Sequence, residues 1–301
     1  MANASTLRGA FTALITPFRD GAVDLDALRE LVDRQIDGGI DGLVPCGTTG
    51  EAATLSYDEQ LDVIRVVVDQ AKGRVPVIAG TGTNNTRNTL AFTKRVAELS
   101  GVDAALVVVP YYNKPNQPGI IHHYTQIAEQ GGLPVVLYNV PGRTVVSMTP
   151  ATIATLAAHP NIIAVKEASG SMRFAAEVFA ALGARDDFAL LSGDDFTTMP
   201  FIAMGGHGCV SVLSNLDPGG LSTLVSDAAG ANLAAARAKN LALQALASAL
   251  FERPNPVPTK AVAAHLGWCT DEVRSPLVPA DEAFVDRVVS LAAAYGLTRD
   301  A

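Results

Sequence analysis

The segment Asn161-Ile162-Ile163-Ala164-Val165-Lys166-Glu167 decides how this chain folds. Its apolar residues are mostly branched, and a proline and a glycine bracket it, which predicts a buried strand of a parallel sheet. Because side chains alternate along a strand, Lys166 is expected to share one face with Ile162 and Ala164. The pattern therefore places a basic side chain at the end of a buried strand.

Seven other apolar segments resemble this one, and helical stretches lie between them. The expected strands are residues 11–15, 42–45, 77–80, 104–109, 135–139, 162–167, 189–192 and 208–212. Helices are expected at or just after Asp24, Ser56, Thr86, Pro118, Thr149, Ser171 and Pro218, where N-cap residues or prolines precede apolar stripes. Eight strand–helix units in about 230 residues predict an α/β fold, the (β/α)8 or TIM barrel.

The chain is expected to divide into this barrel, residues 1–231, and a C-terminal helical extension, residues 232–301, packed on it. No convincing strand occurs after residue 231. Residues 233–250 are rich in Ala and Leu and predict one long helix, which Pro254, Pro256 and Pro258 follow.

Composition argues against several classes of protein. The chain has 301 residues, 49% of them hydrophobic, and a formal net charge of −8 with no Lys/Arg cluster, which argues against binding to nucleic acid. No apolar stretch approaches the ~18 residues that span a membrane. The three cysteines, Cys46, Cys209 and Cys269, lie far apart and predict neither a disulfide framework nor a zinc site. Without a signal-peptide pattern at the start, a cytoplasmic location is expected.

Polar residues gather where the expected strands end. These ends carry Cys46-Gly47-Thr48-Thr49-Gly50-Glu51, Pro110-Tyr111-Tyr112-Asn113, Tyr138-Asn139, Lys166 and Gly193-Asp194-Asp195. The carboxyl ends of the strands of a (β/α)8 barrel open at one mouth, where such enzymes hold their active sites. The sequence therefore predicts an active site that contains Lys166.

Lys166 has two interpretations. An amine removed from water loses part of its preference for the charged form, and a neutral amine can attack a carbonyl carbon to form a Schiff base. Alternatively, Lys166 pairs with Glu167 at the strand end and extends to water, as lysines in structural ion pairs do. The polar residues at the neighbouring strand ends favour the first interpretation.

Three further features also have a functional and a structural interpretation. The turn at residues 47–50 offers N–H groups and two hydroxyls that can hold a carboxylate, or it is an ordinary strand-to-helix turn. Tyr138, expected beside Lys166 on the neighbouring strand, can shuttle protons, or it is a core tyrosine with a satisfied hydroxyl. Arg143, in a loop that a proline and a glycine shape, can clamp a carboxylate, or it is solvated.

Other chemically notable residues favour structural roles. Asp194 and Asp195 precede a helix and are interpreted as its caps. The five histidines make no set of strand-end ligands, so a metal-dependent barrel hydrolase is not indicated. The segment 80–82 lacks the third glycine of a dinucleotide-binding fingerprint.

These motifs resemble those of the 4-hydroxy-tetrahydrodipicolinate synthase (dihydrodipicolinate synthase) family, within the pyruvate-dependent class I aldolase and N-acetylneuraminate lyase superfamily. The similar segments are residues 47–51, 110–113, 138–144, 165–168 and 191–195. The Thr-Gly-Glu turn, the Tyr-Asn-x-Pro segment and the lysine are similar across the superfamily and imply pyruvate and a Schiff base. The Gly-Arg-Thr continuation at residues 142–144 is more specific to the synthases.

The resemblance implies roles for eight residues. The catalytic ones would be Lys166, which would condense with pyruvate, and a proton relay of Thr48, Tyr138 and Tyr112. The substrate-binding ones would be Thr49, Arg143, Val210 and Gly193, with Thr48 and Thr49 on the pyruvate carboxylate. Arg143 would meet the carboxylate of L-aspartate 4-semialdehyde. Neither a metal nor an organic cofactor is implied, because the protonated imine of pyruvate on Lys166 is itself the electron sink.

The resemblance also implies an assembly. Tyr112 would reach into a neighbouring subunit's site, so a dimer would be the smallest active unit, and the usual assembly is a homotetramer, a dimer of dimers. Lysine-sensitive members carry a feedback site at the dimer interface, which maps here to Ala52, Tyr57, Gln60, Asn84, Asn88 and Tyr111. Sensitive relatives have an acidic residue in place of Asn88. Because a buried ammonium group needs an anion, we expect weak or absent inhibition by L-lysine.

The expected activity is condensation of pyruvate with L-aspartate 4-semialdehyde to 4-hydroxy-tetrahydrodipicolinate, the first committed step of the diaminopimelate and lysine pathway. A related pyruvate aldolase or dehydratase acting on a sugar acid or another aldehyde is an alternative, which Arg143 disfavours. A non-catalytic barrel that senses a keto acid is another. The intact set of Lys166 and the three relay residues disfavours it, since a sensor need not retain a proton relay.

Overall fold

The computed structural model describes residues 3–299, and its centre is a ring of eight parallel strands. In chain order the strands are β1 (Gly9–Ala13), β4 (Gly42–Val44), β5 (Ile78–Gly80), β6 (Ala104–Val108), β7 (Val135–Asn139), β8 (Ile162–Glu167), β9 (Ala189–Ser192) and β10 (Gly208–Ser211). They pair in the order β4-β1-β10-β9-β8-β7-β6-β5, and a parallel bridge between Leu43 and Val77 brings the two edges together. The predicted (β/α)8 barrel is thereby confirmed.

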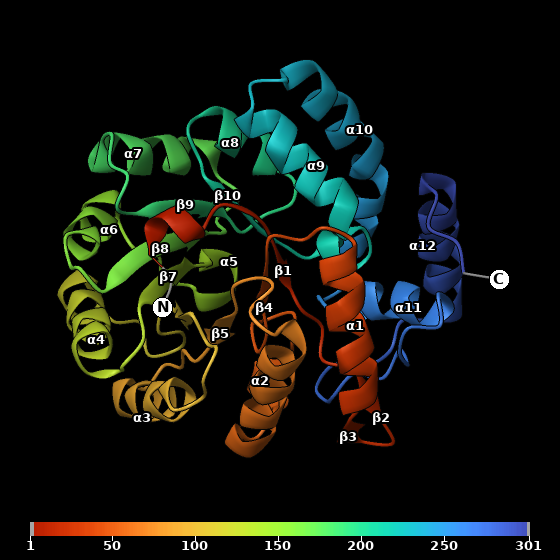
Figure 1. Ribbon diagram of the computed structural model, residues 1–301, viewed down its shortest axis with the longest axis horizontal. Coiled ribbons are helices and arrows are strands. Elements are labelled where there is room, and N and C mark those ends of the chain that lie inside the picture. Colours follow the sequence, from red (N-terminus) through yellow and green to blue (C-terminus); the bar gives the residue numbers. More distant parts are fainter. Residues whose placement is uncertain (1–2, 300–301) are drawn as a thin grey trace.

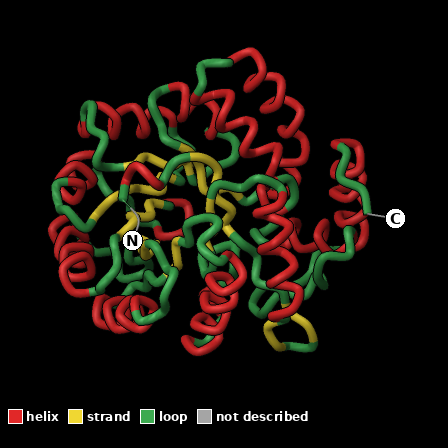
Figure 2. Tube along the Cα trace, in the orientation of Figure 1, coloured by secondary structure: helices red, strands yellow, loops and turns green. Residues whose placement is uncertain are grey.

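Helices surround the ring of strands (Figure 1), and Figure 2 shows the strands in the interior with the helices outside them. They are α1 (Leu25–Asp37), α2 (Tyr57–Ala71), α3 (Thr86–Ala97), α4 (Gln117–Gln130), α5 (Pro141–Thr144), α6 (Pro150–Ala157), α7 (Met172–Leu182), α8 (Thr198–Ala203) and α9 (Pro218–Ala229). Three short 3-10 helices accompany them: η1 (Ala4–Thr6), η2 (Ala52–Thr54) and η3 (Leu213–Asn215). None of the helices within the described part of the chain has the length and apolar character to cross a bilayer.

The helix starts follow the capping residues of the sequence. The side chains of Asp24, Ser56, Thr149 and Ser171 each accept a hydrogen bond from the backbone N–H three residues later. At the other three predicted starts the cap lies one or two residues earlier, at Asn85, Asn116 and Asp217. The local pattern therefore specifies where these helices begin.

After α9 the chain continues in three helices at one side of the barrel (Figure 1), namely α10 (Leu233–Leu250), α11 (Val257–His265) and α12 (Glu282–Tyr295). The long helix predicted at residues 233–250 is confirmed. Helix α10 packs on α9, and α12 packs on both α10 and α11. Between residues 232 and 299 there is no strand, as expected.

A small hairpin of β2 (Phe18–Arg19) and β3 (Ala22–Val23) was not expected from the sequence. Its turn residues, Asp20 and Gly21, have φ of 54° and 81°, which matches the Asp-Gly preference of tight hairpin turns. The dipeptide was a usable signal, but the two-residue strands were too short to show alternation. The first barrel strand also begins at Gly9, two residues before the predicted start.

One predicted side-chain direction on β8 is wrong. Val135 of β7 pairs with Ile162, whereas the next residue, Val136, pairs with Ala164, so the register shifts by one residue. Such a bulge interrupts the alternation of side chains. Ile162 consequently packs outside the barrel, and Ile163 joins Ala164 in its interior.

The buried apolar residues form two layers. One lies between the strands and the surrounding helices, and the other fills the barrel itself. The inner layer includes Phe11 and Val210, and Ala4 and Leu7 from the N-terminal segment pack into it. These two residues precede β1, so they cover the amino-terminal end of the barrel. The opposite end of the barrel, where the strands have their carboxyl ends, is therefore the expected place for an active site.

Candidate active site

Lys166, Tyr138 and Thr48 lie together in the mouth of the barrel. Lys166 on β8 is only 5% exposed, and its register partner on β7 is Tyr138. The Lys166 Nζ lies 4.3 Å from the centroid of the Tyr138 ring. The Tyr138 hydroxyl lies 3.4 Å from the Thr48 Oγ1, which makes a long hydrogen bond. Tyr138 thus contacts both the Lys166 amine, through its ring, and the Thr48 hydroxyl, through its own hydroxyl, and a tyrosine hydroxyl in such a place can exchange protons.

The alternative interpretation of Lys166, an ion pair with Glu167, is wrong. The Glu167 carboxylate accepts hydrogen bonds from Asn139 Nδ2 at 2.7 Å and from the Ser169 N–H at 2.6 Å. Burial raises the pKa of Glu167 above its usual range. Within residues 3–299 the Lys166 amine makes no ion pair with a carboxylate, and it lies against the ring of Tyr138.

Gly193, after β9, contacts the stem of Lys166. A Cβ at this position would lie 2.9 Å from both Cγ and Cε of Lys166, and 2.6 Å from the Cβ of Ala168. These distances are below van der Waals contact, so only glycine leaves the lysine its present path. The resemblance implied substrate binding for Gly193, and the geometry adds a packing requirement.

The turn after β4 presents Thr48 and Thr49 in different directions. Thr48 lies toward Tyr138, whereas the buried Thr49 Oγ1 accepts a hydrogen bond from Asn255 Nδ2 at 2.9 Å. Asn255 belongs to the C-terminal extension, far along the chain. Because Asn255 donates to the Thr49 oxygen, the Thr49 O–H can still donate to a carboxylate, as can the Thr48 hydroxyl and the backbone N–H groups of the turn.

A pocket of about 400 Å³ lies above these residues. Thr48, Tyr138 and Arg143 line it, and Asn255 and Leu277 from the C-terminal extension complete its wall. Arg143 is exposed and sits on the short helix α5, not in the loop that the sequence indicated. Pro141 occupies the first position of this helix, which suits proline because no N–H is needed there.

Of the eight residues that the resemblance implied, Thr48, Tyr138 and Arg143 line this pocket, whereas the other five do not, namely Lys166, Tyr112, Thr49, Val210 and Gly193. Tyr112 is 88% exposed, with φ of 72°, and does not line the pocket among the described residues. The Val210 side chain is buried in the inner layer of the barrel, paired with Phe11 of β1. A single chain therefore assembles Lys166, Tyr138, Thr48 and Arg143, but not Tyr112.

The six residues of the expected lysine site lie on and between η2, α2, α3 and the segment after β6. Gln60 is buried and donates to the carbonyl oxygen of Ala52 at 3.1 Å. Tyr57 stacks on Phe92 of α3. The remaining members are Asn84, whose carbonyl oxygen accepts from Asn113 Nδ2, the exposed Asn88 and the partly exposed Tyr111. None of the six carries a charge.

The interpretation of Asp194 and Asp195 as helix caps is wrong. Helix α8 begins after Thr197, and no side chain caps it. Asp195 is buried and accepts N–H groups of Val212 and Leu213 after β10, which ties two strand ends together. Desolvation raises its pKa. Asp194 holds the turn before α8 through Phe196 N–H.

Metal binding has no support in the described residues, where no group of three or more His, Cys, Asp and Glu side chains could hold an ion. His207 lies before β10, and its Nδ1 accepts the Leu190 N–H at 2.9 Å, so this histidine joins two strands.

The comparisons with known proteins agree with this geometry. Residues 6–294 match the model of the Dihydrodipicolinate synthetase family. The chain belongs to this family. A 4-hydroxy-tetrahydrodipicolinate synthase of Geobacter sp. (strain M21) is 49% identical over 290 residues, which is 96% of this chain and 99% of that protein. The synthase of Geobacter sulfurreducens is 46% identical over the same shares.

Solved structures of family members share the fold. The dihydrodipicolinate synthase of Aquifex aeolicus has a TM-score of 0.94 and 38% identity, covering 98% of this chain and 100% of that chain. A monomeric synthase variant has a TM-score of 0.95 at 38% identity, covering 98% and 99%. The synthase of Cyanidioschyzon merolae with lysine bound has a TM-score of 0.93 at 38% identity, covering 97% and 99%.

Proposed function

We propose that this enzyme condenses pyruvate with L-aspartate 4-semialdehyde to give 4-hydroxy-tetrahydrodipicolinate, at the start of the diaminopimelate and lysine pathway. The observation that carries the proposal is the buried, unpaired Lys166 against Tyr138 in a family whose members are named as this synthase. Family membership disfavours the alternative activity on a sugar acid. The reaction is that of a lyase of the class I aldolase type.

The amine of Lys166 attacks the ketone carbon of pyruvate, and loss of water gives an imine. Loss of a proton from the methyl group then gives an enamine, whose carbon adds to the aldehyde of the semialdehyde. The amine of that substrate next attacks the imine carbon, which closes the ring and releases Lys166. The protonated imine accepts the electrons, so we propose that neither a metal nor an organic cofactor takes part.

The neighbouring groups serve these steps through proton transfer and charge. Tyr138 and Thr48, hydrogen-bonded to each other, pass protons to and from the imine. The turn at residues 47–50 receives the pyruvate carboxylate. Arg143, which lines the pocket, pairs with the carboxylate of the second substrate. Gly193 leaves room for the stem of Lys166, and Val210, whose side chain is buried in the barrel, would meet the substrate only through its backbone.

The test is turnover of pyruvate and L-aspartate 4-semialdehyde, coupled to the NADPH-dependent reductase of the next step. We expect Lys166→Ala to abolish turnover, because alanine has no amine to form the imine beside Tyr138. Borohydride with pyruvate should leave a reduced adduct on Lys166 in the wild type, detectable by mass spectrometry. An adduct without turnover would retain the imine chemistry and refute the proposed aldehyde. No adduct would refute the mechanism.

We further propose that the active form is a cytoplasmic homotetramer, a dimer of dimers, in which Tyr112 completes the neighbouring subunit's relay. Its 88% exposure and its place outside the pocket of its own chain support this role.

Inhibition by L-lysine is expected to be weak or absent. The six residues of the expected site offer no carboxylate to an ammonium group, and Gln60 is already committed to Ala52 and Leu55. The measurement is the rate of turnover against lysine concentration. Strong inhibition at sub-millimolar lysine would contradict the prediction.

A further inference from the structure

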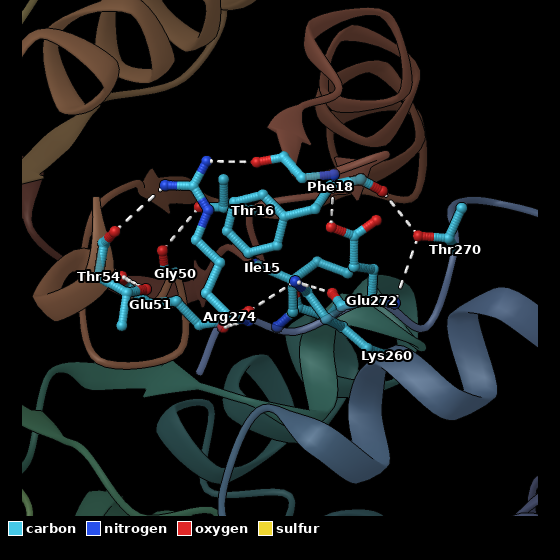
Figure 3. A network of polar contacts seen from close by, with 12 residues as sticks. Ile15, Thr16, Phe18, Gly50, Glu51, Thr54, Lys260, Thr270, Glu272 and Arg274 are labelled. Atoms are coloured by element: carbon cyan, nitrogen blue, oxygen red, sulfur yellow. Dashed lines mark hydrogen bonds and ion pairs between the residues drawn. The ribbon is translucent and has the colours of Figure 1, made fainter. Parts of the chain in front are cut away.

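A buried ion pair joins the C-terminal extension to the turn at the barrel mouth (Figure 3). Lys260 on α11 is fully buried, and its Nζ lies 2.5 Å from Oε1 of Glu51, which is 4% exposed. The two residues are 209 positions apart in the chain. The pair is separate from Lys166 and has no part in the steps described above.

Every polar atom of the pair has a partner. Lys260 Nζ also donates to the carbonyl oxygen of Glu272 at 2.8 Å and lies 4.0 Å from the centroid of the Phe18 ring. The second oxygen of Glu51 accepts the backbone N–H of Arg274 at 3.0 Å. Figure 3 shows these groups converging on one point between the turn and the C-terminal segment.

Stability alone is a poor explanation for this arrangement. Removing two charges from water is costly, and apolar side chains of similar volume often stabilise a core equally well. Desolvation lowers the pKa of Lys260 in spite of the opposing effect of Glu51, which indicates that burial of this ammonium group is costly. A fully partnered buried pair does, however, define one geometry, since its hydrogen bonds are directional.

The Lys260–Glu51 pair fixes the geometry of the turn at residues 47–51. Glu51 closes the turn, its N–H donating to the Thr48 carbonyl oxygen at 3.1 Å, and it has the left-handed φ of 53°. Asn255, five residues before Lys260, donates to the Thr49 hydroxyl. The same C-terminal segment therefore contacts the turn at two places, Thr49 and Glu51.

We propose that the Lys260–Glu51 pair positions the turn at residues 47–51 for pyruvate, which makes Lys260 a positioning residue for the reaction at Lys166. The inference rests on the proposed function, because it assumes pyruvate at the turn. Thr48 reaches Tyr138 across 3.4 Å, so a small displacement of the turn would break the relay and move the N–H groups that face the carboxylate. Lys260 does not line the pocket and acts only through Glu51.

The test uses the double variant Glu51→Gln with Lys260→Met in the full chain, which removes both charges and leaves neither one unpaired. Borohydride trapping at Lys166 is measured against pyruvate concentration, with no aldehyde present. We expect the double variant to fold. The pyruvate concentration for half-maximal trapping should rise at least roughly tenfold. Glu51→Gln alone retains a hydrogen-bond acceptor, so it should raise the pyruvate concentration for half-maximal trapping by a smaller factor.

Glu59→Gln is the matched control, because Glu59 pairs with Arg274 of the same segment but does not touch the turn. This variant should lose stability with no change in the pyruvate concentration for half-maximal trapping. Wild-type values in both the double variant and Glu51→Gln would overturn the inference, as would an equal shift in the control. If the double variant fails to fold, Glu51→Asp decides, because it keeps both charges and shortens the carboxylate side chain by one methylene; a wild-type pyruvate dependence in Glu51→Asp would then overturn the inference. A wild type that traps no pyruvate would instead refute the proposed function, and the inference with it.

Discussion

At the scale of single residues, the path of the Lys166 side chain depends on the absence of a Cβ atom at Gly193. Gly193 leaves the space through which the lysine stem passes, and the nearest stem atoms lie within 2.9 Å of where a Cβ would be. Close packing makes such a position sensitive to one methyl group. The residue thus affects the reaction without any polar group of its own.

Gly193→Ala is expected to displace Lys166 and reduce pyruvate trapping about 100-fold, while the free energy of unfolding falls by about 1–3 kcal/mol. The measurements are borohydride trapping and denaturant unfolding. Gly119→Ala on α4 is the control, because its Cβ would come no closer than 3.3 Å to Asn116 Oδ1. Normal trapping by a folded Gly193→Ala variant would contradict the prediction, because the Lys166 side chain would then have found another path to pyruvate.

At the scale of elements, helices α3 and α4 meet at a buried histidine. His123 of α4 is 3% exposed, its Nδ1 lies 2.9 Å from the Thr86 hydroxyl, and its Nε2 has no partner. Desolvation, with a smaller effect of His122, lowers the pKa of His123 from 6.5 to about 4. The helix contact therefore requires a neutral ring.

Stability is expected to fall as the pH drops from 6.5 to about 4. In that window the unfolded chain binds a proton at His123 and the folded chain does not, so acid favours unfolding, by up to about 3 kcal/mol. His123→Asn, whose side chain can still reach Thr86, should reduce this pH dependence in denaturant unfolding. The exposed His122→Asn is the control and should not. An identical pH dependence in His123→Asn and the wild type would contradict the prediction that His123 causes the loss of stability in acid.

At the scale of the whole molecule, one chain brings together only part of the proposed relay. Tyr112 has a strained, left-handed φ of 72°, is 88% exposed and does not line the pocket of its own chain. An exposed tyrosine of this kind suits an interface, where its ring is buried and its hydroxyl finds a partner. The proposed assembly would provide that burial.

Complementation between two inactive variants tests this assembly. In a mixed dimer of Tyr112→Phe and Lys166→Ala, the site with the native lysine receives the native tyrosine from the other subunit. Mixing and reassembly should restore about a quarter of the wild-type turnover, since half of the dimers are mixed and each has one intact site. Each variant alone is the control. No recovery, with mixed dimers shown by mass spectrometry, would place Tyr112 outside the partner's relay.

Much of the fold follows from local pattern. Apolar runs between capping residues such as Asp24 and Ser56 specify where strands and helices begin to within about two residues, because alternation and capping act over a few positions. The hairpin at Asp20 and the register shift at Ile162 were not foreseen, since very short strands show no period and a bulge depends on the partner strand.

The sequence by itself determined the barrel, the lysine at a strand end and, through family resemblance, the expected chemistry. Only the tertiary structure decided that Glu167 bonds to Asn139 and Ser169, which leaves Lys166 beside Tyr138. It also decided that Asn255 and Lys260 hold a turn some 200 residues earlier in the chain. The reason is physical: alternation and capping are local, whereas the partner of a buried polar group depends on which distant segments pack together.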